Sequence, residues 1–405
     1  MTKQRSAAPR QDANGTWRFV VDLGPGPDAK GVWRERRQAF RRGFPTKKAA
    51  LQVMDELRVA SRAGTFVAPQ RQTLKDFLEV EWLPAVRRQL AESTLDSYER
   101  NCRHHIIPAL GGIQLQALDG AHLNRFYATL LETGRKRGNQ SPGLKPRTVR
   151  YIHTIVHSAL DDAVKWRRVT LNAADQATPP SAKSAKAPEM ATWTGPELAT
   201  FLERTDGDRY GYAWAFLALT GCRRGEALGL RWSDVDLDAS SAAIRQQVIP
   251  LPKSSGTGRE ARIVSGTKGG DARVIELDQR TVTTLRTWKA RQAQERLLIG
   301  GGYDDHGLVF PRPDGRPFHP EAFSKTFDRR VRQAAFADLP TIRLHDLRHT
   351  WATLALEAGV DVAVVSKQLG HSSPVITWGT YQHVRQGLKA DAVQRVADSI
   401  FAGGA

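Results

Sequence analysis

Residues 177–190 (ATPPSAKSAKAPEM) interrupt the chain with a polar stretch rich in proline, alanine and lysine. No apolar periodicity runs through this stretch, and its composition is typical of a flexible connection between folded parts. A chain of 405 residues with such an interruption is not expected to bury its apolar residues in one continuous core. At roughly 100–200 residues per domain, the sequence predicts two to four domains, with a boundary in this linker.

The two stretches before the linker differ in pattern. Residues 72–176 have apolar residues at helical spacing and predict an all-α domain. One helix is expected to begin at Thr73 and a second at Ser93 or Thr94. Two more are expected over Leu118–Leu131 and Arg147–Trp166. Residues 1–65 predict a small α+β domain, a three-stranded sheet plus a helix. Its expected elements are a strand over Thr16–Leu23, further strand within Val32–Phe40, and a helix capped by Thr46.

The stretch after the linker, residues 191–405, mixes helical and strand patterns and predicts a mainly α domain of the α+β class. Its strands are expected over Ala242–Ile249, Ala261–Val264 and Arg273–Leu277, the last two joined by the turn SGTKGG. Its helices are expected to begin at Thr194 and to span Tyr212–Thr220, Thr281–Leu298, Pro320–Ala335 and Asp346–Glu357.

A formal net charge of +18 and a pI near 10.2 favour a polyanionic partner, and nucleic acid is the usual one. The front of the chain is the most basic part, with 14 Lys and Arg against 6 Asp and Glu in residues 1–62. Within it, Arg34, Arg36 and Arg37 are candidate DNA-binding residues. An anionic membrane is the rival partner, but the longest apolar run, Ala213–Leu219, is far shorter than the ~20 residues of a spanning helix.

The sequence also narrows the compartment and the chemistry. The polar N-terminus lacks an apolar signal segment, and the two cysteines, Cys102 and Cys222, lack metal-ligand spacing. These features predict a protein of a reducing cytosol. No phosphate-binding loop, dinucleotide fingerprint, serine-hydrolase elbow or zinc motif occurs. We therefore expect no cofactor and no metal, and a reaction that uses side chains alone.

Cationic and hydrogen-bonding groups concentrate in three stretches of the last 190 or so residues, at residues 220–226 (TGCRRGE), 344–350 (LHDLRHT) and 369–383. His345 and Arg348 lie three apart at a predicted helix start, where an anionic phosphate binds well. A second arginine, Arg223, opens another helix, and two arginines can stabilise the extra charge of a phosphoryl transition state. Tyr381 lies in a polar segment with no apolar stripe around it, so we expect an accessible phenol with few buried contacts.

Four motifs stand in one order: TGCRRGEALGLRW, VSGTKGGDARVIEL, LHDLRHTWATL and LGHSSPVITWGTYQHV. Together they resemble the tyrosine recombinase (phage integrase) family. The resemblance extends upstream, because residues 72–176 look like the family's core-DNA-binding helical domain. Residues 1–65 look like the arm-type DNA-binding domain of integrases from temperate phages and integrative elements. The resemblance thus implies a catalytic domain over residues 191–405.

The resemblance also implies roles for individual residues. Arg223 matches the first catalytic arginine, and Glu226 matches an acidic position that supports the site. Lys268 matches a lysine that donates a proton to the leaving 5′ oxygen, with Lys253 as the alternative. The remaining matches are His345 and Arg348 for a catalytic pair, His371 for a position that holds His or Trp, and Tyr381 for the nucleophile. His349 is interpreted as a packing or supporting residue.

The implied function is that of a site-specific DNA recombinase, an integrase that cleaves and rejoins strands through a 3′-phosphotyrosine intermediate. It would integrate, and excise, a mobile element or prophage in the cytoplasm of a bacterial host, in association with the nucleoid. The implied partners are double-stranded DNA at core and arm sites, a homotetramer on DNA, and a directionality factor, with no membrane. The alternative is a non-catalytic DNA-binding regulator that keeps the fold. A type IB topoisomerase shares the chemistry but lacks the front domain.

Overall fold

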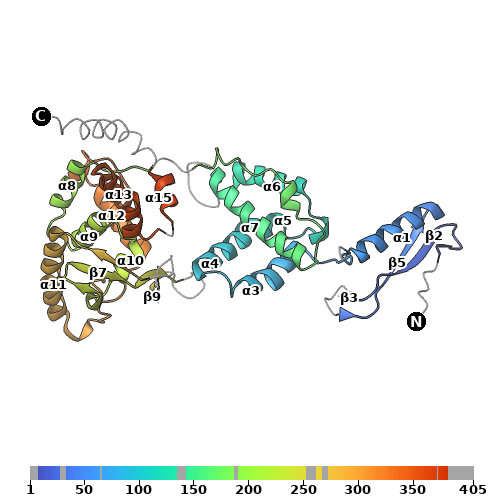
Figure 1. Ribbon diagram of the computed structural model, residues 1–405, viewed down its shortest axis with the longest axis horizontal. Coiled ribbons are helices and arrows are strands. Elements are labelled where there is room, and N and C mark those ends of the chain that lie inside the picture. The colour runs from blue at the N-terminus through green and yellow to red at the C-terminus, as the bar shows by residue number, and fades with distance from the viewer. Residues whose placement is uncertain are drawn as a thin grey trace, which may run out of the picture. The chain divides into compact units, whose positions relative to one another are not determined.

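The computed structural model describes residues 8–27, 33–63, 66–134, 143–186, 190–251, 261–266, 272–371 and 373–381 (Figure 1). Internal contacts divide the chain into two units, residues 1–188 and 189–405. The described part of each unit contains two hydrophobic clusters. None of the described helices is both long and apolar enough to cross a membrane.

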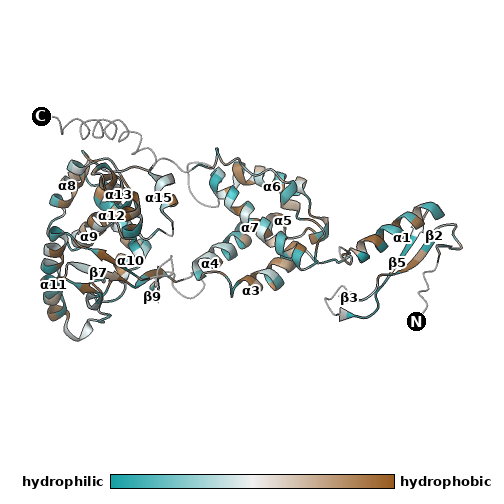
Figure 2. Ribbon diagram, viewed as in Figure 1, coloured by the Kyte–Doolittle hydropathy of each residue, from teal (hydrophilic) through white to brown (hydrophobic). Residues whose placement is uncertain are grey.

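The first part of the chain forms the expected three-stranded sheet with one helix. The antiparallel sheet has the order β1-β2-β5, and helix α1 packs on β2. Hydrophilic and hydrophobic residues both occur along α1 (Figure 2), and its buried side meets Phe19 and Val21 of the sheet. The elements are β1 (Arg10–Gln11), β2 (Trp17–Asp22), β5 (Gln38–Phe44) and α1 (Lys47–Arg62), with a separate pair β3 (Gly26–Pro27) and β4 (Trp33–Arg34).

Two local expectations for this part can be compared with the structure. Thr46 caps α1 as predicted, because its hydroxyl accepts a hydrogen bond from the Ala49 backbone N–H at 3.2 Å. The strand expected within Val32–Phe40 occurs in two pieces, since β4 lies inside this range and β5 begins inside it at Gln38 and continues to Phe44. Phe19 to Asp22 of β2 pair with Gln38 to Arg41 of β5.

The second part of the first unit is all-helical, as predicted, around a core of Leu, Ile, Val and aromatic side chains. Its short elements are α2 (Leu74–Asp76), η1 (Phe77–Trp82), α3 (Leu83–Val86), α4 (Glu92–Asn101), η2 (Cys102–Ile106), α5 (Ile107–Leu110), η3 (Leu115–Ala117) and η4 (Ala173–Gln176). The two long helices are α6 (Gly120–Thr133) and α7 (Pro146–Lys165). Thr73 starts this series with a capping box to Asp76, as predicted.

Sequence reasoning placed the start of α4 wrongly. The helix begins at Glu92 with Ala91 as its N-cap, not at Ser93 or Thr94, and no side chain caps it. The carboxylate of Glu92 lies in the first turn, where the helix dipole favours a negative charge. The π-helical segments η1 and η2 each precede a proline, Pro84 or Pro108, near the start of the following helix. A proline that follows a helical turn removes one N–H donor and displaces a carbonyl, which a widened turn accommodates.

The second unit surrounds one apolar helix, α9, which contacts α8, α10, α11 and α13. Its helices are α8 (Gly195–Arg204), α9 (Gly211–Thr220), α10 (Arg224–Gly229), α11 (Gln279–Ile299), α12 (Pro320–Val331), α13 (Asp346–Glu357), α14 (Val362–Leu369) and α15 (Pro374–Thr380). Short turns are η5 (Trp232–Asp234), η7 (Gly300–Gly302) and η8 (Ala334–Phe336). Thr194 forms the predicted capping box of α8, and α13 has both its predicted ends.

The strands of this unit differ from the expected pattern. The predicted strand Ala242–Ile249 is broken at Arg245 into two, and each half pairs with a different partner. One sheet has the order β10-β7-β6, and β8 pairs with β9. Among the described residues, β9 and β10 therefore pair with β8 and β7 and not with each other. The strands are β6 (Val235–Asp236), β7 (Ser241–Ile244), β8 (Gln246–Pro250), β9 (Ala261–Ser265) and β10 (Arg273–Glu276).

Candidate active site

Arg223 is held where one helix ends and the next begins. Helix α9 ends at Gly221, whose φ of 66° is in the left-handed region. A Cβ at Gly221 would lie 2.8 Å from Leu369 of α14, so a side chain there would clash with α14 and would also strain the backbone. Arg223 then precedes α10, and its side chain keeps a quarter of its surface exposed. The turn therefore presents a guanidinium at a helix start, as the sequence predicts.

Glu226 is fully buried beneath Arg223 and accepts four hydrogen bonds. Two come from Arg223, its backbone N–H at 2.9 Å and its Nη1 at 2.8 Å. Two come from Arg273, whose Nη1 and Nη2 lie 3.0 and 2.6 Å from the two carboxylate oxygens. Burial alone would raise the pKa of Glu226, but the bonds and charges of Arg273, then of Arg223, lower it below its usual value. Glu226 is thus ionised and holds the Arg223 side chain by hydrogen bonds.

Sequence reasoning missed Arg273, the first residue of β10. Only 13% of its side chain is exposed, and its Nε donates to the Gln368 carbonyl at 3.1 Å in addition to its two bonds with Glu226. Its partner carboxylate lies in a different motif, 47 residues earlier in the chain. No local pattern around a single arginine in a strand marks such a pair.

Arg348 of α13 is more deeply buried than predicted. The sequence predicts that Arg348 lies with His345 at a helix start, where a phosphate binds well. In the structure Arg348 is 4% exposed, and its Nη1 donates to the Gly221 carbonyl at 2.7 Å. Burial, followed by the nearby charge of Arg223, lowers the pKa of Arg348 to about 10. Helix α13, which carries Arg348, packs on both α9 and α14.

His371 follows the last turn of α14, which ends at Gly370 in the left-handed conformation. The Gly370 carbonyl accepts a hydrogen bond from Arg223 Nη2 at 2.7 Å, so this turn touches the first arginine directly. His371 Nδ1 lies 2.7 Å from the Thr377 hydroxyl of α15. Burial lowers the pKa of His371 to about 4, and the charges of Arg348 and Arg223 add to the effect. These residues therefore share one electrostatic environment.

Tyr381 is buried, contrary to the expectation of an accessible phenol. It is 1% exposed and packs in a small cluster with buried residues of α13 and α14, namely Ala352, Leu356, Val365 and Leu369. Its hydroxyl oxygen lies 2.7 Å from Nδ1 of His349. Burial raises the pKa of Tyr381 to about 12, with Arg348 opposing the shift. Its surroundings come from two other helices, so the polar segment around it gave no sign of them.

His345, the N-cap residue of α13, lies beside His349, which contacts this phenol. The rings of His345 and His349 are 5.0 Å apart and nearly perpendicular. His345 keeps an exposed edge, yet protein surrounds enough of its ring to lower its pKa to about 4, with His349 and Arg348 contributing. Burial also lowers the pKa of His349. Both imidazoles are therefore neutral near pH 7 and can accept protons.

The structure thus brings Arg223, Glu226, Arg348, His371 and Tyr381 together, with His345 at the edge of the group. Lys268 and Lys253 lie outside the described residues. The three candidate arginines of the front domain belong to the other unit. There, Arg36 pairs with Asp22 at 2.9 Å, and Arg37 donates to backbone carbonyls of residues 23–25.

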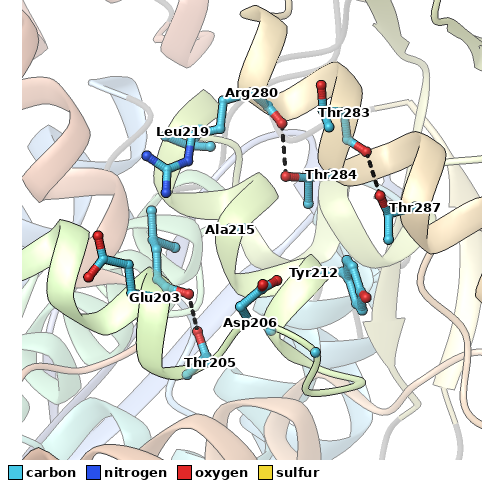
Figure 3. A pocket seen from close by; sticks show the side chains of 13 residues that line it. Glu203, Thr205, Asp206, Tyr212, Ala215, Leu219, Arg280, Thr283, Thr284 and Thr287 are labelled. Atoms are coloured by element: carbon cyan, nitrogen blue, oxygen red, sulfur yellow. Dashed lines mark hydrogen bonds between the residues drawn. The ribbon is translucent and has the colours of Figure 1, made fainter.

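A pocket of about 450 Å³ lies elsewhere in the second unit, between α8, α9 and α11 (Figure 3). None of the predicted site residues lines it. Its threonine hydroxyls are occupied within their own helices, since Thr284 donates to the Arg280 carbonyl at 2.8 Å and Thr287 to that of Thr283 at 3.1 Å. The pocket therefore has no visible part in the chemistry of the arginine and tyrosine cluster.

Sequence comparison matches both units to one family. Residues 196–387 match the phage integrase family, and residues 73–131 match the N-terminal SAM-like domain of phage integrases. "Tyrosine recombinase XerC-like" of Caldanaerobacter subterraneus subsp. tengcongensis is 25% identical over 392 residues, covering 94% of this chain and 96% of that protein. The "ICEBs1 integrase" of Bacillus subtilis is 24% identical over 408 residues, covering 95% and 98%.

Solved structures show the same fold. The integrase of the transposon Tn1549, in complex with transposon right end DNA, matches with a TM-score of 0.65 at 17% identity, over 80% of this chain and 99% of that chain. A lambda integrase dimer bound to a core site matches with a TM-score of 0.55 at 14% identity, over 94% and 96%. Fold and site together define a tyrosine-type site-specific DNA recombinase. The chain belongs to the phage integrase family.

Proposed function

We propose that this chain is an integrase that cleaves and rejoins double-stranded DNA with Tyr381 as its nucleophile. The observation that carries the proposal is that residues from three separate motifs lie close together in the folded chain. Arg223, Arg348 and His371 share one electrostatic environment, and Tyr381 lies against the same helix, α13, that carries Arg348. Two guanidinium groups beside a phenol suit a phosphodiester, whose transition state carries an extra negative charge.

The proposed step breaks one phosphoester bond and forms another in its place. The Tyr381 phenol loses its proton, its oxygen bonds to the scissile phosphorus, and the bond from phosphorus to the 5′ oxygen breaks. The products are a 3′-phosphotyrosine ester and a 5′ hydroxyl, so the reverse step rejoins a strand without ATP. His349 is neutral near pH 7 and lies 2.7 Å from the phenol oxygen, which places it to accept the phenolic proton.

The 5′ oxygen takes up a proton as it leaves. We assign its donor as Lys268, with Lys253 as the alternative, on the basis of the sequence motif alone. His345 and His371 are assigned to contact the phosphate as hydrogen-bond donors, since the hydrogen bond of His371 to the described residues uses only Nδ1 and His345 keeps an exposed edge. Arg and Lys then supply the positive charge that a metal ion would otherwise provide.

The DNA partner is proposed to contact both units. The helical domain and the catalytic domain would bind core sites, and the front domain would bind arm sites. Val20 and Phe40 form a cross-strand pair that points outward, with 38% and 49% of their surface exposed, and the exposed Arg42 follows on β5. This face adds apolar contacts for base edges to the cationic candidates Arg34, Arg36 and Arg37.

The assembly proposed on DNA is a homotetramer that exchanges strands between two sites, assisted by a directionality factor. Its cellular role would be the integration and excision of a mobile element, with the protein associated with the nucleoid. The relatives support this role by name only, because the integrase of Bacillus subtilis carries the name of ICEBs1 and that of Tn1549 the name of a transposon.

Covalent trapping on a random-sequence library tests the proposal and identifies the DNA site in one experiment. Duplexes of random sequence with a single nick are incubated with the full chain, and adducts that survive denaturation are recovered and sequenced. We expect one enriched sequence, joined through its 3′ phosphate to a peptide that contains Tyr381. Enriched binding without any covalent adduct would support the non-catalytic regulator, and adducts without sequence preference would support a topoisomerase.

A further inference from the structure

We propose that Arg273 is a positioning residue of the active site. It acts through Glu226 on Arg223 and through the end of α14 on His371, and it touches no reacting atom itself. This inference rests on the proposed function, because it assigns a role in the same cleavage step. Three contacts that join β10, α10 and α14 carry it.

The first two contacts make Glu226 a shared carboxylate. Oε1 accepts from Nη1 of both arginines, at 2.8 Å from Arg223 and 3.0 Å from Arg273. Oε2 accepts from the Arg223 backbone N–H and from Nη2 of Arg273. Each oxygen is therefore fixed from two sides, and the position of the Arg223 guanidinium follows from where Arg273 holds the carboxylate.

The third contact fixes the turn that carries His371. Arg273 Nε donates to the Gln368 carbonyl, and Arg223 donates to the carbonyl of Gly370 two residues later. The Arg273 guanidinium also fills the space beside Gly370, where a Cβ would lie 2.9 Å from its Cζ. The end of α14 is thus clamped between the two arginines that share Glu226.

Charge balance explains why removal of Arg273 would disturb the site. Two arginines and one carboxylate leave one net positive charge, available to a phosphate through Arg223, the more exposed of the two at 25% against 13%. Without Arg273, the buried Glu226 would keep only Arg223 as a cationic partner. The carboxylate would then hold that guanidinium more strongly to itself, and a buried charge that loses a partner is costly.

Arg273 also anchors one end of the segment that contains Lys268. The Gly266 N–H donates to the Arg245 carbonyl at 2.8 Å, and Arg273 pairs with Ile244. Gly266 and Arg273, which precede and follow Lys268 in the chain, therefore lie opposite two neighbouring residues. Arg273 is the first residue of β10, and its side chain bonds to Glu226. The strand that follows Lys268 is therefore connected to the carboxylate that supports Arg223.

The test compares Arg273 with a matched arginine away from the site. Arg209 has a similarly buried side chain (15% exposed), bonds to Glu295, and donates to the Pro311 carbonyl. The variants are Arg273→Ala, Arg273→Lys, Arg209→Ala and Arg209→Lys in the full chain. The probe is the nicked duplex recovered with the wild-type protein. Single-turnover adduct formation at saturating protein, DNA affinity and thermal unfolding are measured for each variant.

We expect Arg273→Ala and Arg273→Lys to slow adduct formation about 10- to 100-fold at unchanged DNA affinity. Lysine keeps the charge but cannot reach both Glu226 oxygens and the Gln368 carbonyl at once. The Arg209 variants lose comparable stability and cleave at the wild-type rate. In a Glu226→Gln background, the further loss from Arg273→Ala is smaller, because Arg273 acts through that carboxylate.

The outcomes separate this inference from the function on which it rests. Absence of adducts with the wild-type chain would overturn the proposed function itself. With an active wild type, a folded Arg273→Lys variant that cleaves at the wild-type rate would overturn the positioning role. Equal slowing by the Arg209 and Arg273 variants, in step with their loss of stability, would show a general structural contribution and overturn it too.

Discussion

Replacing Tyr381 with Phe separates its two properties, its buried ring and its reactive hydroxyl. The ring stays in the cluster with Leu356 and Leu369, so the apolar contacts persist. The hydroxyl and its contact with His349 Nδ1 at 2.7 Å are lost. Because no other side chain is assigned to attack the phosphate, we expect no covalent adduct at all, while DNA affinity changes little.

The magnitude of the stability change follows from that one contact. A hydrogen bond contributes about 0.5–1.5 kcal/mol net, and an unpaired buried partner raises the cost to about 1–3 kcal/mol. His349 keeps part of its surface exposed and can recover water, so we expect a loss of about 1–2 kcal/mol. For a unit of this size, each kcal/mol lowers the melting temperature by about 2–4 °C. Tyr381→Ala, which also empties the ring site, should lose about 3–5 kcal/mol.

The helical domain supplies a matched control for this substitution. Tyr127 is 2% exposed, and its hydroxyl lies 2.8 Å from Nδ1 of His153. Tyr127→Phe should lose similar stability and still form the adduct. The assay is adduct formation on the trapped duplex, read on a denaturing gel, together with urea unfolding. A Tyr381→Phe protein that still forms an adduct would refute the assignment of the nucleophile.

Three further predictions follow from the same site and domains. Arg223→Ala and Arg348→Ala should each slow adduct formation by about 10²–10³ yet leave detectable traces, measured on the same gel. Deletion of residues 1–62 should weaken recombination of long sites while sparing cleavage of the core duplex, and unchanged long-site recombination would exclude an arm-binding role. His345 and His371 have pKa values lowered from 6.5 to about 4. Between these values the unfolded chain binds more protons, so stability present above pH 6.5 should be lost as the pH falls toward 4, measured by urea unfolding at pH 7.5 and 5.

The sequence predicted the features that depend on local pattern. The bounds of α13 and the caps at Thr46 and Thr194 were predicted correctly, because capping and helical periodicity involve residues within one or two turns. Arg223 and Glu226 are three residues apart at the start of α10. That spacing brings their side chains within hydrogen-bonding distance of each other.

The features that the sequence did not predict depend on packing between distant segments of the chain. Tyr381 is buried because side chains of α13 and α14 cover it, and its own segment is polar. Arg273 matters because β10 brings it to Glu226, and its strand gives no sign of that partner. The break at Arg245 likewise depends on which strands pair, which alternation along one strand does not specify.

The clamp at the end of α14 constrains how relatives of this chain can diverge. Gly370 has a φ of 68°, which disfavours any side chain, and the Arg273 guanidinium occupies the place where a Cβ would lie. A side chain at position 370 would therefore require that Arg273 move away or be replaced by a shorter residue, in addition to the backbone strain. That change would in turn leave Glu226 short of a partner. The three positions should covary as one unit across an alignment of homologues, although they are separated by 47 and 97 residues in the chain.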